Sequence, residues 1–338
     1  MLGESFYLKF LAEIDYWAES GLLVKDGDGY YMDLETEGLG RAYLITSKGY
    51  SIYVGRDVLA RFVWAGLFGA TSMISIADNR QNHSFKQVFA VVSKVLEAGL
   101  YYDKNFGDLT TAQTQRAIAT LSKTAPEHVG FGFIKLKSGV MSGRKGTVVK
   151  FHDFIATLEK EVDVVLSEKS KDLRKNQYYY TKVQKIATAT IKWFDLSRDK
   201  DQDIVFDATQ MLSFEGNTGI YQLYTYARIT NILARTETTA QLTSASISLL
   251  NTQELTILHT MYTLPYTLET AISTLSPHIL ANHLLQLSSL INSWYASNSV
   301  AGEVDSARRD ALLGLCRLMQ THLSFCLQLL AIEPLERL

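Results

Sequence analysis

The sequence predicts an α/β domain followed by an all-α region. In the first 150 residues, short apolar runs of strand type alternate with helical patterns, which is typical of an α/β layer with parallel strands. After about residue 150 the strand patterns stop, and apolar residues recur at intervals of three and four. We therefore expect an α/β part over 1–150, a helical connector over 151–216 and a helical bundle over 217–338.

The elements of the first part follow from periodicity and from the glycines between them. The expected helices and strands are, in order, a helix over Tyr7–Ser20, strands in GDGYYMDL and AYLITSKGYSIYV, a helix over Asp57–Trp64, a strand over Ser72–Ala77 and a helix over Ser84–Ala98. The apolar stretch Val58–Ala77 contains one charge, Arg61. A buried helix followed by a buried strand explains this stretch better than a membrane span.

Long helical patterns fill the second part. The expected helices are Asp153–Leu166, Tyr178–Phe194, one that follows Ser276-Pro277, and Ala307–Leu330. Ser276 is expected to cap its helix, with Pro277 at the first helical position. Cys316 and Cys326 lie in the last helix, too far apart to form a disulfide, and we expect buried thiols and no metal site because no paired Cys/His spacing occurs.

The composition is that of an ordinary globular protein, but its charge is unevenly distributed. Of 338 residues, 47% are hydrophobic and 20% are charged, with a formal net charge of −2. Lys135 to Lys192 holds thirteen Lys/Arg and six Asp/Glu, a net charge of +7, whereas no lysine follows Asp201. If both regions bind nucleic acid, the first would attract phosphates, and the second would use arginine, aromatic and polar contacts.

Three segments carry candidate chemistry. The first begins at Tyr53 and Asp57, which share a helix face, and Gln81 follows later in the chain. A phenol, a carboxylate and an amide can hold a planar cation by hydrogen bonds. Taken alone, the residues favour the simpler interpretation, in which Asp57 caps a helix and Tyr53 fills the core.

The second segment is the glycine-bracketed loop Gly139–Thr147, and the third is Ser213–Gly219 with the helix after it. The loop contains adjacent cations and a serine, which suit a polyphosphate, although a solvated hairpin turn fits the same residues. In the third segment, Gly-Asn-Thr-Gly forms a helix-entry turn. The tyrosines of the following helix fit either a core stripe or a stacking surface.

Together these segments resemble the arginyl-tRNA synthetases, a family of class I aminoacyl-tRNA ligases. The resemblance covers nearly the whole chain. The matching segments, in chain order, are HVGFG, MSGRKGTVV, DLSRD, FDATQMLSFEGNTG with IYQLYTYARI, and the ending ARRDALLGLCRLMQ…LLAIEPLERL. MSGRKG is similar to the family's KMSKS loop, and the C-terminal helices resemble its DALR anticodon-binding domain. The resemblance implies a partial Rossmann-like catalytic domain, a connector and that helical domain.

The resemblance also implies a reaction, its partners and the site residues. Arginine and ATP, with Mg²⁺, would form arginyl-adenylate, and the arginyl group would then pass to tRNA(Arg) in the cytoplasm, with no membrane involved. Tyr53, Asp57 and Gln81 would bind the substrate's guanidinium, with Asp57 as its ion pair. The remaining implied residues are Ser142, Arg144 and Lys145 at the pyrophosphate, and His128, Val129 and Met141 at the ATP.

For tRNA binding, residues of both charge regions are candidates. Arg228, Asn292, Trp294 and Tyr295 are expected to stack on or read bases, and Lys171 and Lys175 to contact phosphates.

The sequence departs from the family pattern in three places. Val140 stands where KMSKS has its first lysine, and His83 is shifted by one from the family's His-Phe-Lys-Gln. No HIGH motif occurs, so we expect weak activity unless a complementary N-terminal polypeptide supplies that half of the site. A non-catalytic tRNA-binding module is the alternative function, and a helical interaction protein without an RNA role is a third.

Overall fold

The computed structural model describes residues 4–101, 104–124, 126–136, 151–169, 177–206, 211–236 and 241–337. The chain divides into two compact units, Met1–Gly132 and Phe133–Leu338. The predicted KMSKS-like loop, with Met141, Ser142, Arg144 and Lys145, lies outside the described residues, as do Lys171 and Lys175.

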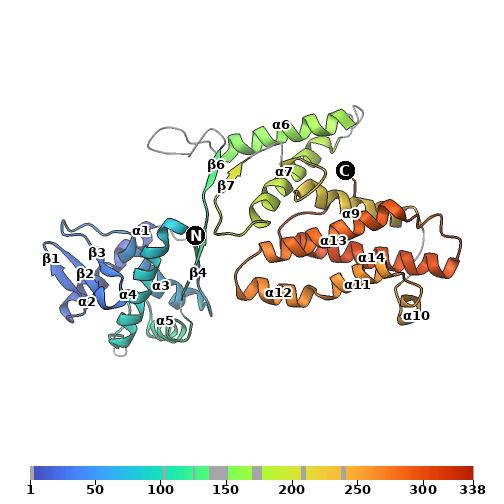
Figure 1. Ribbon diagram of the computed structural model, residues 1–338. Helices are drawn as coiled ribbons and strands as arrows, with labels where there is room; N and C mark the ends of the chain where they lie inside the picture. Colours follow the sequence, from blue (N-terminus) through green and yellow to red (C-terminus); the bar gives the residue numbers. More distant parts are fainter. Residues whose placement is uncertain are drawn as a thin grey trace. The chain divides into compact units, whose positions relative to one another are not determined.

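Unit 1 combines strands and helices around one core (Figure 1). Its elements are α1 (Glu4–Tyr7), η1 (Leu8–Phe10), α2 (Ala12–Glu19), β1 (Val24–Asp26), β2 (Gly29–Leu34), η2 (Glu35–Glu37), β3 (Gly40–Ile45), α3 (Tyr53–Phe68), β4 (Ile74–Asp78), η3 (Asn79–Gln81), α4 (Asn82–Glu97), α5 (Thr111–Lys123) and β5 (Glu127–Phe131). The predicted helix and strand over Val58–Ala77 are confirmed within α3 and β4, but the strand is not buried as expected, since Ile74 and Ile76 are exposed. Among the described residues, no helix is long and apolar enough to cross a membrane.

Strand pairing in unit 1 only partly follows the prediction. β4 and β5 are parallel, as expected for an α/β layer, with Ser75 opposite His128. The strands β1, β2 and β3 instead form an antiparallel meander, so the prediction of parallel pairing is wrong for them. The reason lies in their connections, because short glycine turns can join only antiparallel neighbours.

The helix α3 begins four residues earlier than predicted. Tyr53 is its first residue, and Ile52 is the N-cap in extended conformation. The apolar and aromatic run before Asp57 has the composition of a strand, which is why the helix was expected to begin later. The run is helical instead, and Gly55 allows α3 to lie close to β3, since a Cβ at Gly55 would lie 2.4 Å from the Leu44 carbonyl oxygen. Asp57 therefore lies in the second turn and does not cap the helix.

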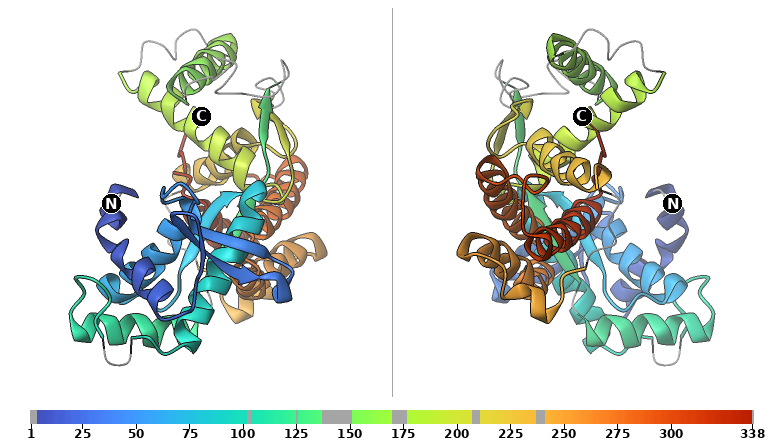
Figure 2. Two further views of the ribbon diagram at one scale, coloured as in Figure 1. Left: turned by 90° about the vertical axis from the view of Figure 1, so that its left-hand side faces the viewer. Right: turned by 90° about the vertical axis from the view of Figure 1, so that its right-hand side faces the viewer.

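Unit 2 is mainly helical (Figure 2). Its described elements are β6 (Ile134–Leu136), α6 (Phe151–Lys169), α7 (Tyr179–Leu196), β7 (Ile204–Phe206), α9 (Gly219–Ala234), α10 (Ser244–Ile247), α11 (Thr252–Tyr262), α12 (Leu264–Ser273), α13 (His278–Ser297) and α14 (Ser306–Leu329). One core joins helices of the expected connector to those of the expected bundle, including Trp193, Ile220 and Trp294. Packing thus does not separate 151–216 from 217–338, and that functional division stays a prediction.

Two local predictions in unit 2 are wrong. No strand was expected after about residue 150, but β7 lies there, and its three residues pair in parallel with β6. The helix α13 begins at His278 with Pro277 as its N-cap residue. Ser276 does not cap it, because its hydroxyl donates instead to the Thr274 carbonyl oxygen at 3.0 Å.

Candidate functional site

The predicted cation site of unit 1 is built on α3 and the β4–β5 pair. Tyr53 is exposed at the start of α3, with the guanidinium of Arg56 5.4 Å from its ring centre. Asp57 is half-buried one turn further on. Gln81 is exposed and ends η3, directly after the carboxyl end of β4. Ligands of parallel sheets bind at such strand ends, so this position suits a substrate contact.

A buried guanidinium, Arg61, lies next to this site and was not assigned a role from the sequence. Its Nε and Nη1 atoms are buried and have no hydrogen-bond partner among the described residues, and its guanidinium lies over the rings of Trp64, Phe85 and Phe89. Burial lowers the pKa of Arg61, and the negative charge of Asp57 opposes this shift. Asp57 therefore already interacts electrostatically with one guanidinium of the protein.

His128 connects this cluster to β5. Its imidazole stacks on Phe85 with ring centres 4.3 Å apart, and its buried Nε2 has no hydrogen-bond partner in the part of the chain that the structure describes. Burial lowers the pKa of His128, so the ring is uncharged at neutral pH. Val129 follows it, opposite Ile76 of β4. The structure thus places Asp57, Arg61 and His128 in one neighbourhood, linked through Phe85.

In unit 2, three of the four predicted base-reading residues are grouped. Arg228 donates to Asn292 at 2.6 Å and to the Tyr224 hydroxyl at 3.0 Å. Its guanidinium lies 4.1 Å from the ring centre of Tyr224 and 4.9 Å from that of Tyr295. This arrangement places a half-exposed cation beside two aromatic rings, a combination on which nucleic-acid bases can stack.

Trp294 does not join this group, so its predicted stacking role is wrong. Its side chain is fully buried, and its indole nitrogen donates to Glu254 at 3.1 Å. Helical periodicity explains the difference, since Trp294 lies on the face of α13 that carries Leu287 and Ile291, whereas Tyr295 lies one residue further round. Trp294 is a core residue, which the sequence also allowed.

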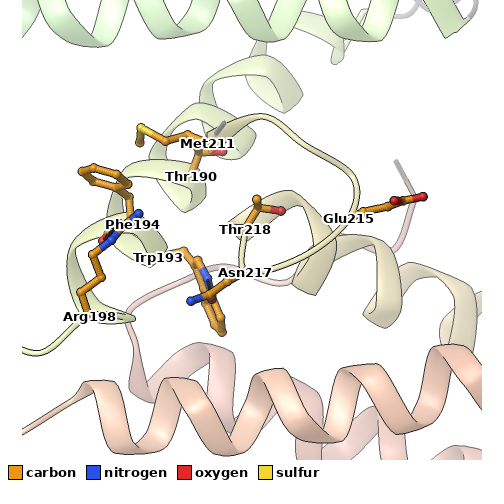
Figure 3. Close-up of a pocket in the computed structure, with 9 residues that line it drawn as sticks. Thr190, Trp193, Phe194, Arg198, Met211, Glu215, Asn217 and Thr218 are labelled. Carbon is orange, nitrogen blue, oxygen red and sulfur yellow. Dashed lines mark hydrogen bonds between the residues drawn. The ribbon is translucent and has the colours of Figure 1, made fainter. Parts of the chain in front are cut away.

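The Gly-Asn-Thr-Gly turn lines a cavity of about 240 Å³ at the start of α9 (Figure 3). Thr218 caps α9 by accepting from the Tyr221 backbone, and Trp193 donates to Asn217 at 2.7 Å. Gly219 lets α9 cross α7 closely, since a Cβ there would lie 2.7 Å from the Ala189 carbonyl oxygen. The turn therefore serves first to join α7 and α9.

Comparisons with known proteins identify the class to which this fold belongs. Residues 1–208 match the family described as tRNA synthetases class I (R), catalytic domain, and residues 222–338 match the DALR anticodon binding domain. The chain is thus a class I synthetase chain with a helical anticodon-binding domain. Within that class, it belongs to the arginyl-tRNA synthetase family.

Individual relatives agree with this assignment. An arginine–tRNA ligase of Streptococcus pneumoniae (strain CGSP14) is 29% identical over 339 residues, covering 99% of this chain and 55% of the relative. The chain therefore spans about half the length of the curated relatives it matches.

Two solved structures share the fold. The arginyl-tRNA synthetase of Plasmodium falciparum superposes with a TM-score of 0.78 at 24% identity, over 100% of this chain and 54% of that one. The Thermus thermophilus arginyl-tRNA synthetase superposes with a TM-score of 0.78 at 19% identity, over 98% of this chain and 58% of that one.

Proposed function

We propose that this chain carries part of the active site of an arginine–tRNA ligase, which activates arginine with ATP and transfers it to tRNA(Arg). The observation that carries the proposal is the match to the arginyl class I catalytic family over residues 1–208. The parallel β4–β5 pair supports it, because His128 lies on β5 and Gln81 follows β4, so substrate and nucleotide would meet at one sheet end.

In the proposed site, Asp57 forms the ion pair with the substrate's guanidinium, and Tyr53 and Gln81 fix its orientation. The buried Arg61 limits this site, because it already partly compensates the charge of Asp57. A planar guanidinium can form two parallel hydrogen bonds to the Asp57 carboxylate, which the compact ammonium of lysine cannot do, and this favours arginine over lysine.

The nucleotide would lie along β5. Among the described residues β5 pairs only with β4, so its second edge offers backbone donors and acceptors near His128 and Val129 to an adenine. Ser142, Arg144 and Lys145 would stabilise the charge that develops on the departing pyrophosphate, and Met141 would contact the ATP. Mg²⁺ would enter with the ATP as part of the substrate.

The ligase reaction is proposed to need residues that this chain does not supply. No HIGH motif occurs in the sequence, and Ile76 in β4 is 74% exposed, an unusual position for an apolar strand residue. A complementary N-terminal polypeptide of the same family would complete the nucleotide site and cover this face.

ATP–pyrophosphate exchange tests this proposal. We expect little arginine-dependent exchange from the chain alone, and an increase of at least about 100-fold when the missing half of a family catalytic domain is added. The same mixture with Lys145→Ala should lose most of that gain. Vigorous exchange by the chain alone would refute the need for a second polypeptide, and no exchange under either condition would refute the ligase.

The alternative is a tRNA-binding module without catalysis. The grouped Arg228, Tyr224 and Tyr295 favour this alternative specifically, because they need nothing from unit 1. A chain that binds tRNA but shows no affinity for arginine would establish it.

A further inference from the structure

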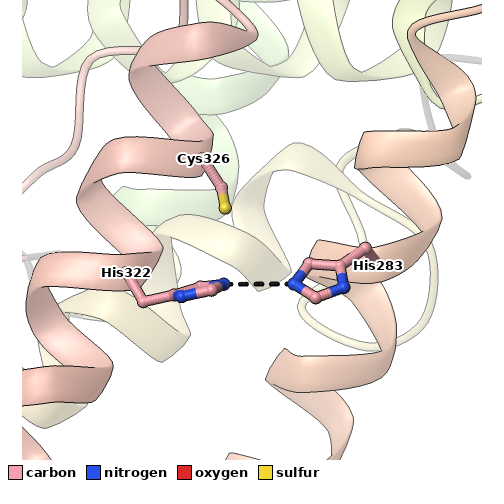
Figure 4. A group of neighbouring side chains, drawn as sticks. All are labelled: His283, His322 and Cys326. Carbon is pink, nitrogen blue, oxygen red and sulfur yellow. Dashed lines mark hydrogen bonds between the residues drawn. The ribbon is translucent and has the colours of Figure 1, made fainter. Parts of the chain in front are cut away.

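Three metal-ligating side chains meet inside the helices of unit 2, on the facing sides of α13 and α14 (Figure 4). His283 comes from α13, and His322 and Cys326 lie four residues apart on one face of α14. His283 and Cys326 are buried, and His322 is partly buried. Ligand sets on facing helices are the usual way in which helical bundles build metal sites.

The distances are close to those of a metal centre. The Nε2 atoms of His283 and His322 are 3.1 Å apart, and one ligand atom from each of the three residues lies within 4.8 Å of the others. In tetrahedral zinc sites, Zn–N bonds of about 2.0–2.1 Å place neighbouring nitrogens about 3.3 Å apart. The imidazoles thus already have nearly the required separation, and the Cys326 sulfur lies within 4.8 Å of both.

The hydrogen bonding of His283 directs its Nε2 toward the centre. The Thr267 hydroxyl donates to the Thr263 carbonyl oxygen, so its oxygen can accept a hydrogen bond from the Nδ1–H of His283, 3.5 Å away. With the proton on Nδ1, the Nε2 lone pair is available to a metal. Such an outer hydrogen bond to a ligating histidine is common in metal sites.

The charge states of the three groups also suit a metal of zinc type. Burial, with a smaller effect of His283, lowers the pKa of His322 to about 4, and burial lowers that of His283, so both rings are neutral near pH 7. Burial raises the pKa of the Cys326 thiol to about 12, so a metal must displace its proton. Cations with strong thiolate bonds can do so, whereas Mg²⁺ and Ca²⁺ prefer oxygen ligands.

We propose that His283, His322 and Cys326 bind one Zn²⁺ ion that links α13 to α14. Binding forms two Zn–N bonds and one Zn–S bond, and the thiol proton of Cys326 passes to solvent. A water molecule completes four-coordination, because the described residues contribute three ligands. This site is independent of the proposed ligase reaction. It departs from the sequence prediction of no metal site.

Without metal, the same residues form an ordinary buried histidine pair, with one Nε2–H donating to the other ring. That arrangement satisfies both Nε2 atoms but gives the neighbouring thiol no role. The two possibilities differ in the number of zinc ions bound per chain and in whether a metal–thiolate absorption band appears, so experiments can separate them.

Zinc binding by the full-length chain tests the proposal, measured by competition with a chromogenic chelator and by elemental analysis. We expect one Zn²⁺ per chain. Cys326→Ala and His322→Gln should each weaken binding by roughly 100-fold or more, since even outer partners of metal ligands contribute 10–100-fold. Cys316→Ala, on the same helix, and His259→Gln, an exposed histidine, are the matched controls and should bind normally.

Cobalt substitution keeps the test valid if a variant fails to fold. The wild-type chain loaded with Co²⁺ should show a thiolate-to-cobalt charge-transfer band that persists in Cys316→Ala. Zinc should also raise the thermal midpoint of the wild type by roughly 5 °C at 100 times its Kd. Absence of the band, absence of stoichiometric zinc, or unchanged binding in both ligand variants would overturn the proposal.

Discussion

At the scale of single residues, Glu254 links several helices of unit 2, although no functional prediction named it. Its fully buried carboxylate accepts two hydrogen bonds of 2.7 Å from Arg308, one from Trp294, and one from the Asn251 backbone. It thereby connects α11, α13 and α14. Burial alone would raise the pKa of Glu254, but the donors, chiefly Arg308, lower it below the ordinary value of 4.5.

Glu254→Gln should reduce the free energy of unfolding of unit 2 by about 2–3 kcal/mol at pH 7, because it removes the buried charge that pairs with Arg308. Among the described residues, that guanidinium then keeps only the more distant carboxylate of Glu303, at 3.9 Å. Since the folded carboxylate has a lowered pKa, its stabilisation is present above pH 4.5 and is lost as the pH falls through the folded value. The difference between wild type and variant, measured by urea denaturation, should therefore shrink on acidification. Glu269→Gln, an exposed acid on α12, is the control, and a pH-independent difference would contradict this account.

At the scale of elements, α3 positions the proposed arginine site through its contact with β3. A Cβ at Gly55 would lie 2.4 Å from the Leu44 carbonyl oxygen, a backbone atom that cannot rotate away. This close approach fixes the first turns of the helix, which carry Tyr53 and Asp57.

Gly55→Ala tests this contact, because the direction in which it changes the free energy of unfolding depends on whether the contact exists. Helix propensity alone would make the variant about 1 kcal/mol more stable. The close approach should instead make it about 1–3 kcal/mol less stable and weaken arginine binding. Chemical denaturation measures the first effect and calorimetry the second, with Ser93→Ala on the exposed face of α4 as the control. A stabilised variant would show that α3 does not depend on the contact.

The elements also show what the sequence could and could not predict. Helices such as α4, α7 and α14 were predicted within one or two residues, because their apolar periodicity is a local property. The start of α3 and the cap of α13 were not, because a contact with β3 and a competing hydrogen bond decide them.

The same reasoning applies to the candidate sites. The zinc cluster depends on His283 and His322, 39 residues apart, so only packing brings them together. Arg61 was visible as one charge four residues after Asp57 in a predicted helix, but its position over the rings of Phe85 and Phe89 appears only in the fold.

At the scale of the whole molecule, the uneven charge predicts how the proposed tRNA partner would be bound. The stretch Lys135–Lys192 carries a net charge of +7, whereas the lysine-free region after Asp201 offers the cluster of Arg228, Tyr224 and Tyr295. Phosphate attraction and base stacking are therefore expected to come from different parts of the chain.

Changing both Lys171 and Lys175 to Glu should weaken tRNA binding and reduce the slope of log K against log salt by about 2, or about one per lost phosphate contact. Arg228→Gln should weaken binding with a smaller change in slope, because its expected contact is with bases. Fluorescence anisotropy at several salt concentrations measures both. An unchanged slope in the double lysine variant would refute the phosphate assignment.

The central claim is that Asp57 binds the guanidinium of a substrate arginine, and calorimetric titration of the chain with arginine tests it most directly. Wild type should bind arginine at least about 10-fold more tightly than citrulline, its uncharged analogue, since hydrogen bonds to a charged group contribute about 1.5–3 kcal/mol. Asp57→Ala should abolish that preference, while Asp15→Asn, an exposed acid on α2, should retain it. Equal and poor binding of arginine by wild type and Asp57→Ala would contradict the claim and favour the tRNA-binding module.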